Sequence, residues 1–173
     1  MWSSWQNIER AKIEQRGHHG IYQIRIVGTD GIPYPIGRFI RVDEEGVLYI
    51  GKAGPSRTLA TRIREFQNVS QFGTASHSGG ETYLLVYMNL MQSNPAYKNC
   101  KLQYRVMHLY ADKVSSMASE DTLKHKIEEE EIKALADYFH KFGELPPCNS
   151  SFPGKFGTFS NRLQHLFGWS TKP

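Results

Sequence analysis

The sequence predicts a small α/β (α+β) domain in which a central antiparallel sheet of three to four strands is flanked by helices. Short runs rich in β-branched and aromatic residues are separated by Gly- and Asp-containing turns in the first third of the chain. Residues 56–66 and 121–142 instead carry apolar residues at helical spacing. A chain of 173 residues can bury a substantial hydrophobic core, and we expect one domain over residues 1–173.

The first expected element is an amphipathic helix over residues 2–16, because its apolar residues recur at roughly helical spacing and a serine precedes them. Gly17 ends this helix, and His18 and His19 lead into a strand. Adjacent strand residues point to opposite faces, so the two histidines are poor joint metal ligands. We expect both to face solvent.

The next expected elements are strands. Residues 21–27 are rich in β-branched side chains and stop at the turn 28–31. Residues 38–42 and 47–51 show alternation on either side of the acidic turn 43–46, which predicts a β-hairpin. Tyr22 and Tyr49 are therefore expected on adjoining antiparallel strands.

A helix is expected to begin at Ser56. Arg62 lies at the edge of its apolar stripe, where the guanidinium could reach past the core toward the strand ends, whereas Arg57 and Arg64 lie further from the stripe. A surface ion pair is the ordinary alternative for any of these arginines. The stripe itself consists of Leu59, Ile63 and Phe66.

The second half is expected to hold two strands and a long helix. A polar loop over residues 67–81, which contains His77, precedes a strand at 82–88. A loop at 91–99 precedes a strand at 101–110. The helix over residues 121–142 ends at Gly143 and a pair of prolines.

Four consecutive glutamates in this helix differ in the direction they face. With Ile127 at 0°, the apolar residues centre near about 70°, Glu131 lies at about 40° and Glu128 at about 100°. Glu129 and Glu130 lie well off that face. A carboxylate among core residues is costly unless a metal or partner neutralises it, so Glu131 and Glu128 are functional candidates. The alternative is that the apolar stripe is narrower and that Glu131 and Glu128 lie only at its border.

The composition is typical of a soluble globular protein, with 39% hydrophobic and 22% charged residues. No apolar run approaches the roughly 18 residues of a membrane helix. The N-terminus lacks the basic and apolar segments of a secretory signal. Cys100 and Cys148 stand in no spacing typical of zinc sites and fit a reducing compartment. We expect a cytoplasmic protein without a membrane partner.

A mild positive charge permits nucleic-acid binding. The formal net charge is +4, with a sequence pI near 9.0. Basic residues cluster at Lys52, Arg57, Arg62 and Arg64. The tail over residues 150–173 also mixes aromatic and basic residues, which could stack on nucleic acid or pack on the domain.

Several short motifs occur together in this chain: Gly20-Ile21-Tyr22, Tyr49-Ile50-Gly51, Leu59 with Arg62, Glu131 on a later helix, and Asn149 after the proline pair. Their combination resembles the GIY-YIG nuclease superfamily, particularly bacterial restriction-type or stand-alone members. The resemblance runs from Gly20 to Asn149, about three quarters of the chain, and implies a GIY-YIG nuclease fold with an inserted hairpin. Residues 20–149 would form the catalytic core, with 1–19 as an N-terminal helical extension.

The resemblance implies a divalent-metal-dependent DNA endonuclease. Glu131, favoured over Glu128, would hold a single Mg²⁺ or Mn²⁺ through hard oxygen ligands. Arg62 would clamp the scissile phosphate, since its planar fork suits bidentate contact. Tyr22 would orient or deprotonate the attacking water, with Tyr49 and Lys52 beside it.

A tyrosine base faces an energetic difficulty, because an unperturbed phenol is about 4 kcal/mol from its phenolate at neutral pH. Lys52, Arg62, His77 or the metal could supply the cation that offsets this cost.

Further residues are candidates for contact with DNA. Gly51 has no Cβ, so a phosphate or the arginine helix can approach the strand end closely. Asn149 would fix the phosphate or the local backbone by resemblance, and Arg57 and Arg64 are additional candidates for binding the substrate.

Three features depart from the family pattern. The connection between Tyr22 and Tyr49 is longer than in compact members, and Phe66 stands where some restriction-type members place a histidine one turn after the arginine. His77 could serve instead. No separate DNA-binding module is present, so loops and tails of the same domain would recognise DNA.

Restriction of foreign DNA is the favoured biological role, and cutting both strands would then call for a homodimer with an isologous contact. A structure-specific or weakly specific repair or recombination nuclease is the alternative within the enzyme class. A nucleic-acid-binding module that kept the fold and lost catalysis is the alternative from a different class.

Overall fold

A four-stranded antiparallel sheet forms the centre of the computed structural model, which describes residues 1–8, 18–74, 76–97, 99–111 and 120–153. The strands are β1 (Gln6–Asn7), β2 (His18–Val27), β3 (Val47–Ala53) and β4 (Lys101–Ala111). Their order across the sheet is β1, β4, β2, β3, so β3 is an edge strand. This arrangement confirms the predicted class of a small antiparallel sheet flanked by helices.

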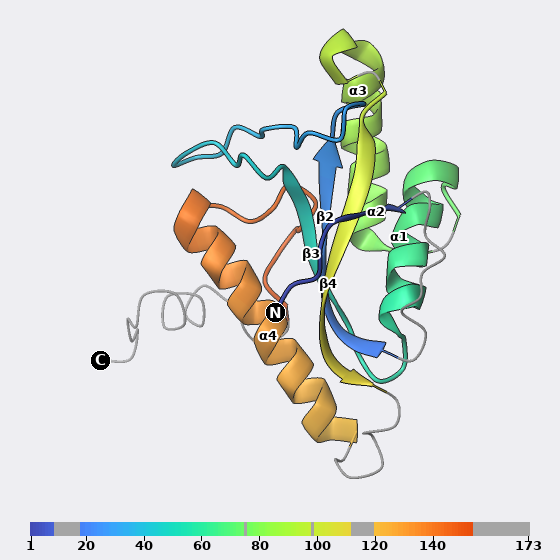
Figure 1. Cartoon of the computed structure of the whole chain (residues 1–173), viewed down its shortest axis with the longest axis vertical. Coiled ribbons are helices and arrows are strands. Elements are labelled where there is room, and N and C mark those ends of the chain that lie inside the picture. Colours follow the sequence, from blue (N-terminus) through green and yellow to red (C-terminus); the bar gives the residue numbers. More distant parts are fainter. Residues whose placement is uncertain (9–17, 75, 98, 112–119, 154–173) are drawn as a thin grey trace.

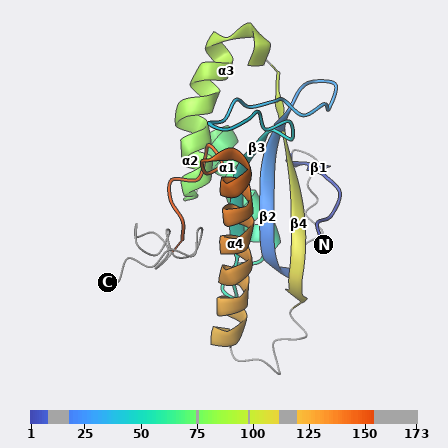
Figure 2. The ribbon, with the colours of Figure 1, turned by 90° about the vertical axis from the view of Figure 1, so that its left-hand side faces the viewer.

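The helices cover both faces of the sheet (Figures 1 and 2). On one face lie α1 (Leu59–Phe72), α2 (Ser78–Thr82), a π-helical segment (Tyr83–Met88) and α3 (Asn89–Ser93), and on the other lies α4 (Glu120–Phe142). A short 3₁₀ turn (Pro95–Tyr97) leads into β4. The described residues contain no helix that is long and apolar enough to cross a membrane.

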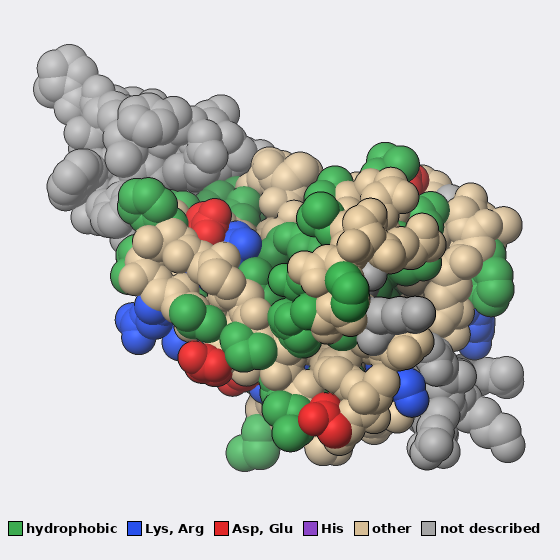
Figure 3. Space-filling model, turned by 90° about the horizontal axis from the view of Figure 1, so that it is seen from above, with side chains coloured by type: hydrophobic (Ala, Val, Ile, Leu, Met, Phe, Trp, Pro, Cys, Tyr) green, Lys and Arg blue, Asp and Glu red, His purple; other side chains and the backbone are tan. Residues whose placement is uncertain are grey.

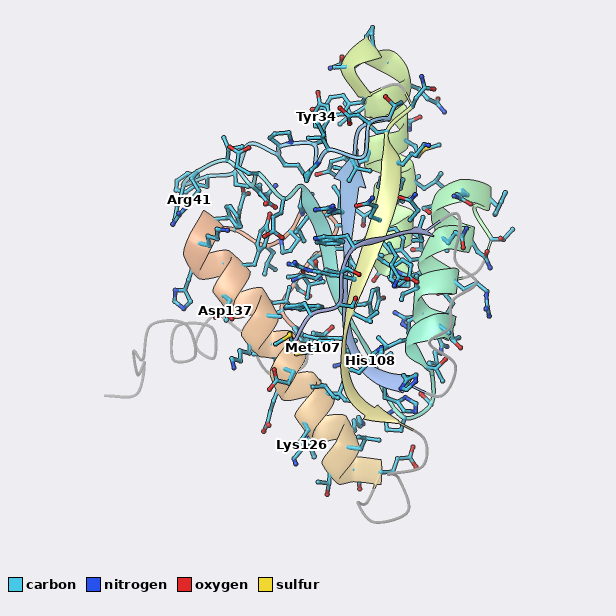
Figure 4. The ribbon with its side chains drawn as sticks, viewed as in Figure 1. Tyr34, Arg41, Met107, His108, Lys126 and Asp137 are labelled. Carbon is cyan, nitrogen blue, oxygen red and sulfur yellow. The ribbon has the colours of Figure 1, made fainter. Side chains whose placement is uncertain are left out.

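Side chains alternate along each strand, so one set packs against α1 and the other against α4. Tyr22 and Ile24 of β2 belong to the core packed on α1, whereas Ile21 packs against α4. In β4, Met107 packs toward α4, and Figure 4 shows Met107 and His108 projecting to opposite sides. The α1 side contributes Leu59, Ile63 and Phe66, and α4 contributes Leu123, Ile127 and Leu135.

Two register shifts shape the sheet. Ile24 pairs with Tyr49 and Arg25 with Val47, so Leu48 is an extra residue in β3. A second shift lies beside Gly20 in β2. A Cβ on Gly20 would lie 2.1 Å from the Met107 carbonyl oxygen across the strand pair, a position that a real side chain cannot occupy. Gly20 therefore permits the close approach of β2 to β4.

The two predicted helices are present with shifted starts. Helix α1 begins after Thr58, whose side chain accepts a hydrogen bond from the Thr61 N–H, and it ends at Gly73 in the left-handed conformation. It therefore starts later than Ser56 and includes residues 67–72 of the predicted loop over residues 67–81. Gly143, with φ of +78°, follows α4 as expected.

The predicted hairpin strand at residues 38–42 is wrong, because this segment caps the carboxyl end of α4 instead. Ile40 N–H donates to the Phe142 carbonyl, and the Arg41 side chain donates to the Lys141 carbonyl. Asp43 is buried and accepts hydrogen bonds from the Val47 N–H and the Tyr138 hydroxyl. The bonds from Ile40 and Arg41 satisfy carbonyls that a helix end leaves without partners.

The predicted strand at residues 82–88 is also wrong, since the segment is helical. A short apolar run is compatible with either structure. Here Gly80 packs closely against Val69 of α1, and a Cβ on Gly80 would lie 3.0 Å from the Val69 Cβ. The loop predicted over residues 91–99 likewise begins later, because α3 continues to Ser93.

The N-terminal helix prediction is wrong for residues 2–8, and its remainder lies outside the described residues. Ser3 N–H donates to the Val106 carbonyl, and β1 pairs with β4. Trp5 lies against the Arg25 and Arg105 guanidinium groups, with 4.2 and 4.4 Å from its ring centroid to the arginine carbons. These contacts with the sheet favour an extended segment over the helix that the spacing of apolar residues predicts.

The end of the molecule that carries the 28–46 connection and α3 exposes several large apolar side chains (Figure 3). Phe39 and Ile40 are exposed in the connection, and Leu85, Val86 and Leu90 are exposed on the helical segments. Scattered apolar side chains of this kind are normal on protein surfaces.

Substitution of Gly20 by alanine is expected to lower the free energy of unfolding by about 2 kcal/mol or more, because the new Cβ would overlap the Met107 carbonyl oxygen. Gly37→Ala is the matched control, since nothing lies within 4 Å of its Cβ position. Urea unfolding of both variants checks this prediction. Equal midpoints for the two variants would contradict it.

Candidate active site

Gly51 is the point at which the two predicted tyrosines meet. It pairs with Tyr22 across β2 and β3, as expected for adjoining antiparallel strands. A Cβ on Gly51 would lie 2.9 Å from the Tyr49 hydroxyl oxygen and 3.0 Å from the Tyr22 hydroxyl oxygen. The two phenols therefore converge over a residue whose missing side chain makes room for them.

His77 contacts Tyr22 directly. Its Nε2 lies 2.6 Å from the Tyr22 hydroxyl oxygen, and its Nδ1 accepts a hydrogen bond from the Gly80 backbone N–H at the start of α2. A backbone N–H can only donate, so the proton of the neutral imidazole lies on Nε2. His77 therefore donates to the Tyr22 oxygen, which leaves the hydroxyl proton of Tyr22 for another acceptor.

Tyr49 is that acceptor. The Tyr22 and Tyr49 hydroxyls share a hydrogen bond in which Tyr22 is the donor. Polar contacts thus run from His77 through Tyr22 to Tyr49. Tyr22 is fully buried and Tyr49 is 8% exposed, so Tyr49 is the member of this series that reaches the protein surface.

Burial controls the protonation of all three groups. Burial raises the pKa of Tyr22 well above its usual value, and it raises the pKa of Tyr49 to about 12. It lowers the pKa of His77 to about 3, with the positive charge of Arg62 acting in the same direction. At neutral pH both phenols are protonated and His77 is neutral. His77 therefore does not supply the cation expected from the sequence.

Arg62 lies close enough to act electrostatically on Tyr22, His77 and Glu131. Its positive charge lowers the pKa of Tyr22, although burial of the phenol dominates. The Arg62 guanidinium donates to the Glu65 carboxylate one turn along α1. Its side chain is 20% exposed, so an incoming anion can reach it.

Lys52, Glu128 and Glu131 form an ionic group on the other side of β3. Lys52 Nζ lies 3.0 Å from Glu128 Oε1 and 3.1 Å from Glu131 Oε2. Glu131 is buried, as its phase in the helix predicts, whereas Glu128 is partly exposed and Glu129 is exposed. Glu131 Oε2 is buried and accepts no hydrogen bond within the part of the chain that the structure describes.

The electrostatics of this group reflect burial and charge together. Burial raises the pKa of the Glu131 carboxyl, with Lys52 acting against it. Burial also lowers the pKa of Lys52, but the two carboxylates more than offset this and the net pKa is raised. The hydrogen bond from Lys52 lowers the pKa of Glu128. Lys52 is thus a cation, and its charge is directed at the two glutamates.

Asn149 binds the edge of β3. Its Oδ1 accepts from the Ile50 N–H at 2.9 Å, and its Nδ2 donates to the Ile50 carbonyl at 2.8 Å. The neighbouring Cys148 N–H donates to the Leu48 carbonyl. Of the two expected roles for Asn149, these contacts fit the fixing of local backbone, one residue before Gly51.

Two predicted substrate-binding residues lie outside this group. Arg57 is exposed and donates to Glu65 at 3.1 and 3.2 Å, and Arg64 is exposed on α1. The solvent prediction for the histidines is wrong for His19, which is buried with its Nδ1 2.9 Å from the Gly54 carbonyl oxygen. His18 stacks on His108 with ring centroids 4.7 Å apart.

Two hollows in the described part of the chain lie away from the candidate site residues. A hollow of about 380 Å³ lies between α4 and the sheet, but it is lined by residues such as Trp2, Arg105 and Tyr138. A second of about 290 Å³ lies beside α3 and Leu48. Neither contains the predicted site residues. Lys52, Arg62 and Glu128 are the partly exposed groups through which a ligand would approach.

Sequence reasoning ranked His77 low and missed the role of Gly79. A Cβ on Gly79 would lie 2.5 Å from the Tyr49 ring, so this glycine lets α2 pack on the tyrosine. Phe66 contacts the edge of His77, with ring centroids 5.1 Å apart. The run His77-Ser78-Gly79-Gly80 was the available signal, because a polar cap before two glycines suits a closely packed helix start.

Comparison of the chain with family models, curated proteins and solved structures finds no match.

The depressed pKa of His77 predicts a loss of stability in acid. The unfolded histidine takes up a proton as pH falls through about 6.5, while the folded one stays neutral to about pH 3. The free energy of unfolding should therefore fall by about 1.4 kcal/mol per pH unit from this group as pH decreases between these values. His77→Gln removes this contribution, whereas the control His125→Gln alters an exposed histidine of α4. Urea unfolding at pH 6, 5 and 4 measures it, and a difference between wild type and His77→Gln that is independent of pH would contradict it.

Proposed function

We propose that this protein is a divalent-metal-dependent DNA endonuclease of GIY-YIG type, most directly a restriction-type enzyme. The observation that carries the proposal is the convergence of Tyr22, Tyr49 and His77 beside Gly51, with Arg62 and Glu131 in electrostatic contact with them. These residues come from β2, β3, α1, the start of α2 and α4. The two triplets that suggested the family meet in the sheet at one pair, Tyr22 with Gly51.

Arg62 and Lys52 are the groups that would bind a phosphate. Both are cationic and partly exposed, and both are neutralised by carboxylates of the protein. A phosphodiester would compete with Glu65 for Arg62 and could accept the paired hydrogen bonds of a guanidinium. Arg57 and Arg64 lie exposed on the same segment and would contact the DNA backbone outside the cleavage point.

Tyr22 would orient the attacking water in its neutral form. Its pKa is raised rather than lowered, so the phenolate is more than about 4 kcal/mol away at neutral pH. Hydrolysis forms a bond from the water oxygen to phosphorus and breaks a P–O ester bond, while the leaving oxygen takes up a proton. Tyr22 could accept the proton of the water only after losing its own.

Water reaches Tyr22 only if the contacts around it open, since its side chain is fully buried. Tyr49 is the phenol nearest the surface and would meet the water first. His77, neutral and locked by the Gly80 N–H, would keep the Tyr22 oxygen in place. We assign His77 a positioning role and not that of a base.

Glu131 is the residue that would hold Mg²⁺ or Mn²⁺. It fits a hard cation because its buried Oε2 accepts no hydrogen bond from the described residues. Such an ion, when bound, supplies positive charge that stabilises the negative charge on the reacting phosphate. No group of three or more histidine, cysteine or acidic residues suited to a metal is found among the described residues, so DNA oxygens and waters would complete the coordination.

Cleavage of supercoiled plasmid tests the proposal. With Mg²⁺ or Mn²⁺ the protein should convert plasmid to nicked or linear forms, and EDTA should stop the reaction. Glu131→Ala should abolish cleavage, whereas Glu129→Ala, at an exposed position two residues away, should retain it. Absence of metal-dependent cleavage on any DNA form would overturn the proposal and favour a binding module without catalysis.

Replacement of Tyr22 by phenylalanine is expected to lower turnover by about 10² or more while leaving DNA affinity unchanged, because the oxygen that orients water is lost and the cations that would bind phosphate are retained. Tyr87→Phe, on the π-helical segment, is the control. Single-turnover cleavage and a filter-binding assay measure the two effects. A fully active Tyr22→Phe enzyme would reject the assigned role.

A further inference from the structure

We propose that the Lys52 ammonium takes the place of a divalent cation in the free protein, and that the cation binds between Glu128 and Glu131 when Lys52 moves out. The inference deepens the proposed function and depends on it for the identity of the cation. It differs from a site with Glu131 alone, because both carboxylates would hold the ion.

The position of Lys52 Nζ suits a small cation. It lies 3.0 Å from Glu128 Oε1 and 3.1 Å from Glu131 Oε2, so one point is within reach of two carboxylates. The glutamates are three residues apart on α4 and therefore share a face of the helix. Mg²⁺ binds oxygen at about 2.0–2.1 Å, so the two carboxylates would close in by about 1 Å.

Glu131 Oε2 gives independent support for a ligand. Its side chain is 9% exposed, and Oε2 is buried without a hydrogen bond from the described residues. Its partner among the described residues is the Lys52 ammonium, in an ion pair of 3.1 Å, so the oxygen needs another cation once Lys52 moves away. A buried carboxylate oxygen in this state is stabilised most by an ion that binds it directly.

The Lys52 side chain is exposed enough to move away from the two glutamates. Its side chain is 32% exposed and lies at the edge strand β3, so the ammonium can turn to solvent on its flexible stem. Glu128 is similarly exposed, at 28%, and can adjust to an incoming ion. Displacement of Lys52 thus requires no change in the core.

Exchange of the two cations would change the charge that a phosphate meets. Two carboxylates and one ammonium carry a net charge of −1, which repels a phosphodiester. With a divalent ion between the carboxylates and Lys52 free, the net charge of the same group becomes +1. Lys52 would then be available to the phosphate, so metal and DNA should each strengthen binding of the other.

Binding of Mn²⁺ to the free protein, followed by electron paramagnetic resonance, tests the inference without any cleavage. Lys52→Met should raise the affinity for Mn²⁺ by about tenfold or more, because a competing charge is removed. Glu128→Gln and Glu131→Gln should each lower it by about tenfold or more. Lys126→Met, at an exposed position of α4, should leave it unchanged (Figure 4).

Unchanged or weaker binding by Lys52→Met would overturn the exchange, and unchanged binding by Glu128→Gln would overturn the paired site. These outcomes are separate from the proposed nuclease function. A wild type that cleaves DNA while Lys52→Met binds Mn²⁺ no better would keep the function and reject the inference. If the wild type never cleaves DNA but the Mn²⁺ affinities of the four variants follow the expected order, the inference is kept and the nuclease function is rejected.

A second measurement uses the wild type alone and is independent of how the variants fold. Acylation of lysines by an amine-reactive ester, read by mass spectrometry, should be faster at Lys52 when Mg²⁺ is added, with Lys126 as the internal reference. A rate at Lys52 that Mg²⁺ leaves unchanged or slows would overturn the exchange.

Discussion

The pairing of Tyr22 with Gly51 is the constraint on which the rest of the site depends. In an antiparallel pair, a shift of one residue moves every side chain to the other face. The observed register brings a phenol opposite a residue that has no side chain, and the free space admits the hydroxyls of both tyrosines. The bulge at Leu48 maintains this alignment while the two strands continue into different connections.

The edge strand β3 divides the site into two parts with different chemistry. On the α1 side, neutral hydrogen-bonding groups are buried together, and each finds a partner in His77, Tyr22 or Tyr49. On the α4 side, charges of opposite sign meet near the surface. Since a low dielectric penalises isolated charges, Tyr22, Tyr49 and His77 stay neutral, whereas the buried Glu131 is paired with the partly exposed Lys52.

The sequence predicted elements that depend on local patterns. The central strand, the last strand and the long helix follow from alternation or helical phase, and phase also separates Glu131 and Glu128 from Glu129 and Glu130. Segments shaped by distant partners were mispredicted. Residues 38–42 bond to the end of α4 about a hundred positions later, and Trp5 stacks on arginines of two other strands. No local pattern encodes such contacts. The contact of His77 with Tyr22, 55 residues away, lies beyond spacing rules for the same reason.

An exposed edge strand invites pairing with another chain, because its outward N–H and C=O groups have no partners. In this protein Cys148 and Asn149 occupy those groups at Leu48 and Ile50. The two residues imitate a fifth strand for a short stretch. The amide that holds the backbone beside Gly51 thereby also discourages sheet-to-sheet aggregation of neighbouring molecules. A residue that fixes the backbone of the candidate site would in this way contribute to solubility as well.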